Sequence, residues 1–298
     1  MGMAEVIPGV SGGTIAFITG IYERLLNAIK AFGPELFQAL RKDGITGAWK
    51  AIDGTFLLFL VGGMAVGIVG GVFGVTFILE HYPPVLWAFF FGLIIASTVY
   101  ISRQVERWSI TKILAFLIGA AVAYAITVLN PGQGNEALWF VFVSGAIAIS
   151  ALILPGISGS FILLLMGMYT LIIPTVKDAL KTFEGEKLLV LAVFAAGCLV
   201  GLVTFSRVLS WTFKYYRDTT LALLTGFMVG SLNKIWPWRN VLTYRTNSSG
   251  EEVPFQEMNV FPGAYEGDPM VIGAIVSLIL GFAIVFVLDA AGSKKPAD

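Results

Sequence analysis

Residues 5–14 read EVIPGVSGGT, and residues 152–161 read LILPGISGSF. The two segments align at one constant offset, which extends to two further pairs, Gly20 with Gly167 and Tyr22 with Tyr169. A Pro-Gly-x-Ser-Gly sequence thus interrupts apolar sequence once in each half of the chain. Paired interruptions of this kind are the best sequence indication of a binding site in a membrane transporter. Backbone that leaves the helix at membrane depth is tolerated only where it is buried in protein or lines a polar cavity.

The composition is that of an integral membrane protein. The chain has 298 residues, of which 57% are hydrophobic and 13% charged, and its mean hydropathy is +0.84. Charge-free runs approach the roughly 20 residues that cross a bilayer, and they cover 54–79, 85–101, 113–129, 188–206 and 271–288. One cysteine and one histidine are too few for an intramolecular disulfide or a Cys/His metal cluster. We expect no cofactor, no metal and no nucleic-acid partner.

The duplication extends beyond the motif, because two glycine pairs recur, Gly63 and Gly67 as Gly197 and Gly201. We therefore expect an all-α integral membrane protein of two inverted-topology repeats, each a re-entrant helical hairpin plus three transmembrane helices. The first repeat is 1–136, with a motif hairpin at 3–29 and spans at about 54–79, 85–102 and 112–129. The second is 137–298, with a motif hairpin at 138–173 and spans at about 188–209, 219–235 and 270–289.

The sequence leaves one other topology open. If each motif segment crosses the membrane once, four spans per half give parallel repeats, and the distribution of Lys and Arg does not separate the two models. We favour hairpins because 138–173 is too long for one span and because the acidic 233–269 loop then lies outside the cell. Both termini are then cytoplasmic. Little apolar sequence precedes the first motif, so either the natural chain begins upstream of Met1 or this arm is unusually short.

The motif has the features of an anion site. After Pro-Gly the chain restarts as a helix, with Ser11 or Ser158 placed as the N-cap, and a helix N-terminus with exposed backbone N–H groups favours negative charge. The alternative is that the motif only kinks a helix and packs it tightly. We predict that two facing tips bind phosphate, with the nearest base assisting. The predicted binding residues are Ser11, Gly12, Gly13, Thr14, Arg24, Ser158, Gly159 and Ser160.

Four further residues are candidates for coupling or gating, namely Glu5, Glu23, Tyr22 and Tyr169. Ionisable residues in membrane segments are functional candidates by default. Glu5 leads the first motif, where the second has Leu152, and it is suited to carry a coupled proton. Alternatively, Glu5 is a residue near the chain terminus whose side chain reaches water. The alternative for Glu23 and Arg24 is that they anchor their helix at the membrane interface. A proton or a sodium ion is the candidate coupling ion.

At these residues the chain resembles a known family. The segments EVIPGVSGGT at 5–14 with GIYER at 20–24, and LPGISGS at 154–160 with GMY at 167–169, are similar to those of the PopT-type polyprenyl-phosphate translocases. The resemblance covers essentially the whole chain, although position 5 is often Asp in the family. It implies a multi-pass plasma-membrane transporter, not an enzyme, that returns undecaprenyl phosphate to the cytoplasmic leaflet. This lipid carries precursors of peptidoglycan and other envelope polymers.

Two other functions are compatible with parts of the sequence. Undecaprenyl-diphosphate phosphatases of the bacitracin-resistance type also have inverted repeats and Pro-Gly-Ser-rich hairpins, but their motif places an Arg directly after a Ser. Here Gly12 and Gly159 stand at that position, so phosphoryl transfer lacks its usual charge stabilisation. The other function is an ion-coupled carrier of a small soluble anion. The expected partners are the bilayer and a polyprenyl phosphate lipid, with a homo-oligomer as a candidate assembly.

Overall fold

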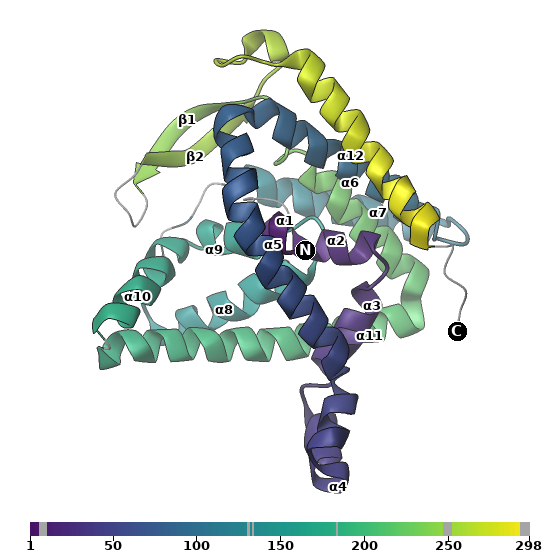
Figure 1. The fold of residues 1–298 in the computed structure, drawn as a ribbon, viewed down its shortest axis with the longest axis vertical. Helices are drawn as coiled ribbons and strands as arrows, with labels where there is room; N and C mark the ends of the chain where they lie inside the picture. The colour runs from purple at the N-terminus through teal and green to yellow at the C-terminus, as the bar shows by residue number, and fades with distance from the viewer. Residues whose placement is uncertain (6–10, 130–131, 133, 183, 247–251, 293–298) are drawn as a thin grey trace.

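The chain folds into helices joined by short connections, with one pair of strands at its edge (Figure 1). The structure is a computed structural model that describes residues 1–5, 11–129, 132, 134–182, 184–246 and 252–292. Its helices are α1 (Gly2–Glu5), α2 (Gly12–Ile18), α3 (Tyr22–Lys30), α4 (Pro34–Ala51), α5 (Gly54–His81), α6 (Pro83–Ser102), α7 (Ile110–Val128), α8 (Leu138–Ile153), α9 (Gly159–Leu165), α10 (Tyr169–Thr182), α11 (Gly185–Ser231) and α12 (Val271–Gly292).

The helical membrane fold predicted from the apolar runs is confirmed. In the described part of the chain, α5, α6, α7 and α11 are long and apolar enough to cross a bilayer, and the bent pair α9–α10 adds a fifth crossing if it counts as one span. Proline explains the sharp boundary between α5 and α6. Pro83 and Pro84 open α6 directly after Tyr82, because proline fits the first helical turn, where its missing N–H would have no partner.

The spans predicted at about 188–209 and 219–235 are joined in the structure without a loop. α11 covers them as far as Ser231 in 47 residues, in which two helices meet at a kink. Only Tyr216 leaves helical geometry, with φ −137° and ψ 42°. The charged residues Arg207 and Arg217 lie on either side of this kink and reach outward from the helix surface, since long side chains carry their charge away from the backbone. Arg207 pairs with Glu35 at 3.8 Å, and Arg217 pairs with Glu23 at 3.7 Å.

Glycines bring α6 against α12 and α7 against α11 in a reciprocal arrangement. A Cβ at Gly92 in α6 would collide with the carbonyl of Leu278 in α12, and a Cβ at Gly226 in α11 would collide with the carbonyl of Phe116 in α7. The partner helices have glycines at the same contacts. A Cβ at Gly281 in α12 would collide with α6, and a Cβ at Gly119 in α7 would collide with α11. Small residues let membrane helices approach closely, and here they join the two halves of the chain.

The acidic loop at 233–269 contains a strand pair that the sequence analysis did not predict. Strands β1 (Arg239–Thr246) and β2 (Glu252–Asn259) pair antiparallel, and the 3-10 turn η1 (Pro262–Ala264) follows them. Two tryptophans fasten this segment, because Trp236 donates to the carbonyl of Val260 and Trp238 to that of Pro269, both at 2.8 Å. In the described residues, the regular structure is therefore helical apart from this hairpin.

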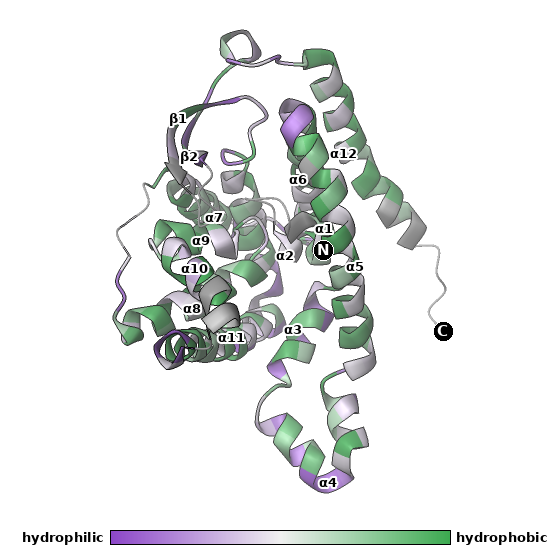
Figure 2. Ribbon diagram, turned by 60° about the vertical axis from the view of Figure 1, so that its left-hand side comes forward, coloured by the Kyte–Doolittle hydropathy of each residue, from purple (hydrophilic) through white to green (hydrophobic). Residues whose placement is uncertain are grey.

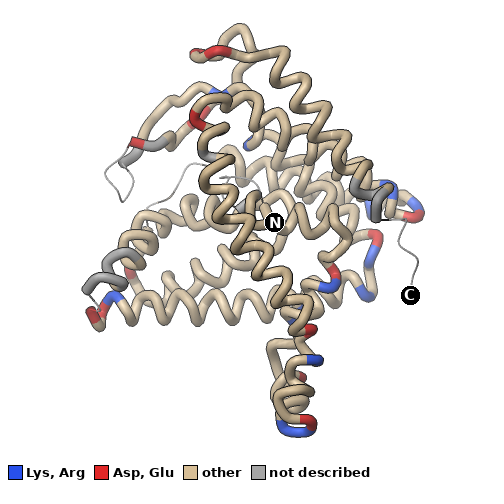
Figure 3. Tube along the Cα trace, viewed as in Figure 1, with Lys and Arg blue, Asp and Glu red and all other residues tan. Residues whose placement is uncertain are grey.

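Apolar and charged residues are separated in space. Figure 2 shows α5, α6 and α12 as largely hydrophobic helices, whereas α4 carries hydrophilic positions. In Figure 3, the charged residues gather at helix ends and in α4, while the central lengths of α5 and α12 carry other residues. α5 exposes large apolar side chains such as Phe59, Val66 and Phe73. Such a surface is stable in contact with lipid.

Candidate functional site

Each motif ends its short helix with the same backbone turn. After α2, Gly20 has φ +72° and its N–H binds the carbonyl of Phe17, while the next N–H binds the carbonyl of Ala16. After α9, Gly167 has φ +69° and makes the equivalent bond to Leu164. This is the Schellman arrangement, which needs a left-handed residue and therefore favours glycine. The turn bends α9 from α10 by 114°, so the second motif segment is a broken helix.

The two motif serines are N-caps, as the sequence predicts. Ser11 Oγ accepts from the N–H of Gly13 at 3.1 Å at the start of α2. Ser158 Oγ accepts from the N–H of Phe161 at 3.5 Å at the start of α9, and it shares a hydrogen bond of 2.9 Å with Ser160 Oγ. Both caps are buried, whereas Ser160 is exposed. Ser160 is therefore the accessible hydroxyl at the start of α9.

The structure brings the two motifs into direct contact. Three hydroxyls of the first motif bond to the backbone where α8 ends and the second motif begins. Ser11 Oγ lies 3.3 Å from the carbonyls of both Leu152 and Leu154, and Tyr22 Oη donates to the carbonyl of Ile153 at 3.0 Å. Thr14 Oγ1 accepts from the N–H of Gly156 at 3.0 Å. Because Ser11, Thr14 and Tyr22 are all buried, the first motif satisfies the broken backbone of the second.

The motif glycines also allow close packing. A Cβ at Gly13 would press on the carbonyl of Ile153, and a Cβ at Gly159 would press on that of Ala148. Gly12 is buried beside Gly13 at the start of α2. These contacts show the tight packing that the sequence presents as the alternative to an anion-binding tip, and anion binding stays a prediction.

The predicted base lies away from these tips. Arg24 forms a two-pronged ion pair with Asp53, at 2.5 Å from Nε and 3.0 Å from Nη2, and its guanidinium lies 4.4 Å from the ring centre of Phe56. The hydrogen bond from Arg24 holds the pKa of Asp53 below its usual value. Glu23 pairs with Arg217. The two ion pairs connect α3, the helix after the first motif, to the start of α5 and to α11. A role of Arg24 in binding stays a prediction.

The remaining predicted residues have different surroundings. Tyr22 is buried between Phe17 and Phe213, with ring centres 4.7 and 6.0 Å away. Its counterpart Tyr169 is half-buried and packs against a cluster that contains Met168. The side chain of Glu5, like residues 6–10 with Pro8 and Gly9, lies outside the described residues.

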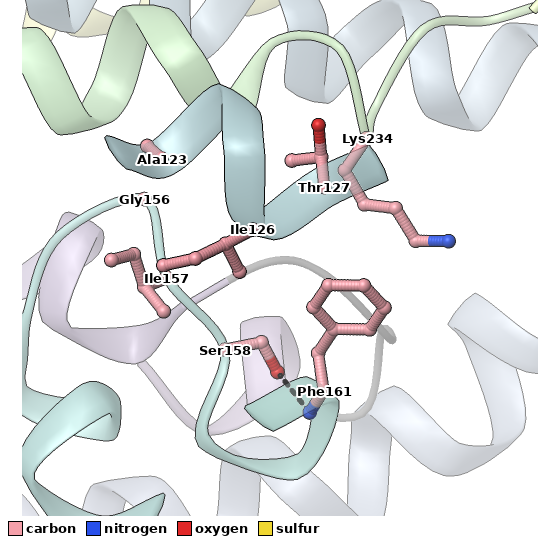
Figure 4. A pocket seen from close by; sticks show the side chains of 8 residues that line it. All are labelled: Ala123, Ile126, Thr127, Gly156, Ile157, Ser158, Phe161 and Lys234. Atoms are coloured by element: carbon pink, nitrogen blue, oxygen red, sulfur yellow. Dashed lines mark hydrogen bonds between the residues drawn. The ribbon is translucent and has the colours of Figure 1, made fainter. Parts of the chain in front are cut away.

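A pocket opens beside the second motif (Figure 4). Its lining residues come from α7, from the motif and from the segment after α11, namely Ala123, Ile126, Thr127, Gly156, Ile157, Ser158, Phe161 and Lys234. Lys234 Nζ lies 4.9 Å from the ring centre of Phe161. Burial holds the pKa of Lys234 below its usual value, and the charge of nearby Glu257 offsets part of this effect. The pocket thus brings together an aromatic ring, a hydroxyl and a cation, and the last two can bind phosphate oxygens. The cavity is small, about 10 Å³, so a phosphate needs it to open further.

Comparison with known proteins shows the family to which this chain belongs. The model of the family described as "VCA0040-like: Undecaprenyl phosphate translocase-like" matches residues 1–253. The chain belongs to this family. A protein of Vibrio cholerae serotype O1 named polyprenyl-phosphate transporter is 47% identical over 266 residues, which is 89% of this chain and 84% of that protein. A Staphylococcus aureus protein of the same name is 31% identical over 298 residues, covering 94% and 93%. No solved structure matches the chain.

The pocket of this chain contains a cation, Lys234, that the sequence analysis did not single out. Lys234 lies in a polar loop and follows a membrane span, where a solvated lysine is common, and it lies outside the repeated motif. Its position beside Ser158 depends on the fold. Among the described residues, no group of three or more His, Cys, Asp and Glu is placed to hold a metal.

Proposed function

We propose that this chain moves polyprenyl phosphate, and undecaprenyl phosphate in bacteria, between the leaflets of the plasma membrane. The observation that carries the proposal is the contact between two Pro-Gly-x-Ser-Gly breaks within an apolar helical protein. Family membership and the names of the two relatives support the substrate. Return of the carrier to the cytoplasmic leaflet would supply synthesis of peptidoglycan and other envelope polymers. The protein then acts as a transporter and not as an enzyme.

An inverted pair of repeats is the architecture that we propose. The reciprocal glycine contacts of α6 with α12 and of α7 with α11 support it, since equivalent helices of the two halves exchange equivalent contacts. In this arrangement α4 and both termini are cytoplasmic, and the strands β1 and β2 lie outside the cell. The two ends of α5 agree with it, because α4 adjoins one end and the strands lie near the other (Figure 1).

The lipid phosphate would be held at the motif tips while the tail stays among the apolar helix surfaces. In the present conformation Ser158 lines the pocket and Ser160 is exposed next to it, whereas the hydroxyls of Ser11 and Thr14 are bonded to the backbone of the other motif. We infer that the two motifs separate during transport, which frees the first set of hydroxyls as the site opens to the other leaflet. Glu5, Glu23, Tyr22 and Tyr169 remain proposed coupling or gating residues, and Arg24 a proposed helper.

Reconstitution in liposomes tests the function. The purified chain should move a short-chain polyprenyl phosphate across the bilayer, and a Ser158→Ala/Ser160→Ala double variant should lower the rate by about 10- to 100-fold, because hydrogen bonds to a charged group contribute about 1.5–3 kcal/mol. Ser150→Ala is the matched control, since Ser150 bonds only within α8, to the carbonyl of Ala146. Lipid movement by empty liposomes and protein liposomes at the same rate would contradict the proposal.

Two parallel measurements separate the other functions. Phosphate release from undecaprenyl diphosphate would indicate a phosphatase-like enzyme, and uptake of inorganic phosphate without lipid movement would indicate a carrier of small anions. We expect neither activity above that of empty liposomes.

A further inference from the structure

The pocket at the second motif carries an excess of positive charge that the motif does not explain. Lys234 and Arg239 both contact the same oxygen of Glu257, with Nζ at 3.2 Å and Nη1 at 2.8 Å. One carboxylate therefore serves two cations. Partly buried cations without a full set of counter-charges are stabilised when an anion joins them.

The two cations differ in their freedom to move. The guanidinium of Arg239 lies 4.2 Å from the ring centre of Trp87, and its side chain is 7% exposed. Lys234 is 23% exposed, has a flexible stem and lines the pocket with Ser158 and Phe161. In Figure 4 the ring of Phe161 lies between Lys234 and Ser158. Arg239 therefore anchors Glu257, whereas the Lys234 ammonium is the member of the group that can change partner.

We propose that Lys234 receives the phosphate headgroup of the lipid at this pocket as it opens, exchanging Glu257 for the phosphate while Ser158 donates a hydrogen bond. This proposal rests on the proposed function and names the charged residue of that site. After the exchange, Glu257 keeps Arg239 as its partner. The carboxylate then competes with the phosphate for Lys234, which lets the lipid leave again.

The arrangement also favours a phosphate monoester over an ordinary phospholipid. A monoester carries about −1.5 to −2 charges near pH 7, whereas a zwitterionic headgroup brings its own cation and gains less from a second one. Lys234 follows shortly after α11 and pairs with Glu257 of β2, so it lies on the side of the molecule that holds the strands. In the proposed topology this is the external side, so Lys234 would load the lipid from the outer leaflet.

Binding of geranyl phosphate, a short polyprenyl monophosphate, to the purified full-length chain in detergent tests the role of Lys234. Lys234→Met should weaken binding by about tenfold or more, and Lys234→Arg should restore most of it. Lys187→Met is the matched control, because Lys187 also pairs with a glutamate, Glu184 at 3.1 Å, but lies outside the pocket. Geraniol, which lacks the phosphate, should bind the wild type and Lys234→Met alike, and inorganic phosphate shows whether the tail is needed.

The sign of a second variant separates binding from a structural role. Glu257→Gln removes the competitor for Lys234 and should tighten binding of geranyl phosphate by a few-fold, opposite to Lys234→Met. If the lysine only supports the fold through its ion pair, both variants should weaken binding together. Equal affinity of wild type and Lys234→Met would overturn the proposal, and it would do so whether or not Glu257→Gln folds. Wild-type chain that fails to move polyprenyl phosphate in liposomes would instead overturn the proposed function.

Discussion

Removing the hydroxyl of Thr14 should destabilise the contact between the two motifs. Thr14 Oγ1 accepts from the N–H of Gly156 at 3.0 Å, and both residues are buried. Valine has nearly the same shape as threonine, so Thr14→Val creates little cavity but leaves a buried N–H without its acceptor. The cost of such a group is about 1–3 kcal/mol. We therefore expect the free energy of unfolding to fall by about 1–3 kcal/mol, a factor of about 5 to 150 in the unfolding equilibrium.

The free energy of unfolding can be measured by adding SDS to the protein in detergent micelles and recording tryptophan fluorescence. Thr225→Val is the matched control. Thr225 is equally buried, but its hydroxyl donates to the carbonyl of Leu221 within its own helix at 2.6 Å. That carbonyl lies inside α11 and keeps its helical partner when the hydroxyl is lost, so we expect a change below about 0.5 kcal/mol. Equal destabilisation by the two variants would refute the assignment of stability to the Thr14 contact. The rate of lipid movement should fall for Thr14→Val alone.

Three further variants test other contacts. Gly226→Ala should lower the free energy of unfolding by about 1–3 kcal/mol, since its Cβ meets the carbonyl of Phe116, whereas Gly62→Ala, with open space around it, should not; SDS unfolding compares them. Tyr22→Phe should cost about 1 kcal/mol in the same assay, because the buried carbonyl of Ile153 loses its donor. The lowered pKa of Asp53 predicts stability that is present above the usual aspartate pKa of about 3.9 and is lost as pH falls through the lower folded value. Asp53→Asn should abolish this part of the acid dependence of unfolding, and an unchanged pH profile would contradict it.

Sequence predicted the helical membrane fold because its signals are local. Charge-free runs report helices directly, since the bilayer demands apolar side chains along the whole length of a span. The contact between the motifs was predicted from duplication alone, and the bonds of Ser11 and Thr14 to the second motif agree with it. The serine caps follow from local sequence as well, because an N-cap needs only its own first turn.

The features that sequence missed depend on contacts between distant segments. The binding role proposed for Lys234 depends on Ser158 and Glu257, and only the folded chain places these two residues near it. Arg207 and Arg217 lie on either side of the kink at Tyr216, and their ion pairs with Glu35 and Glu23 depend on segments far away in the sequence. The strands β1 and β2 lie in a polar loop, where no apolar alternation marks them.

The reciprocal packing of α6 on α12 and of α7 on α11 bears on how the chain acquires its fold. The last long helix of each half, α7 or α12, packs against a helix of the other half. Neither half can therefore bury its glycine-lined surface by itself. Residues 1–136 and 137–298, produced as separate polypeptides in one cell, should recover activity only together, in the manner of a split enzyme. A half synthesised alone should be removed by membrane proteases.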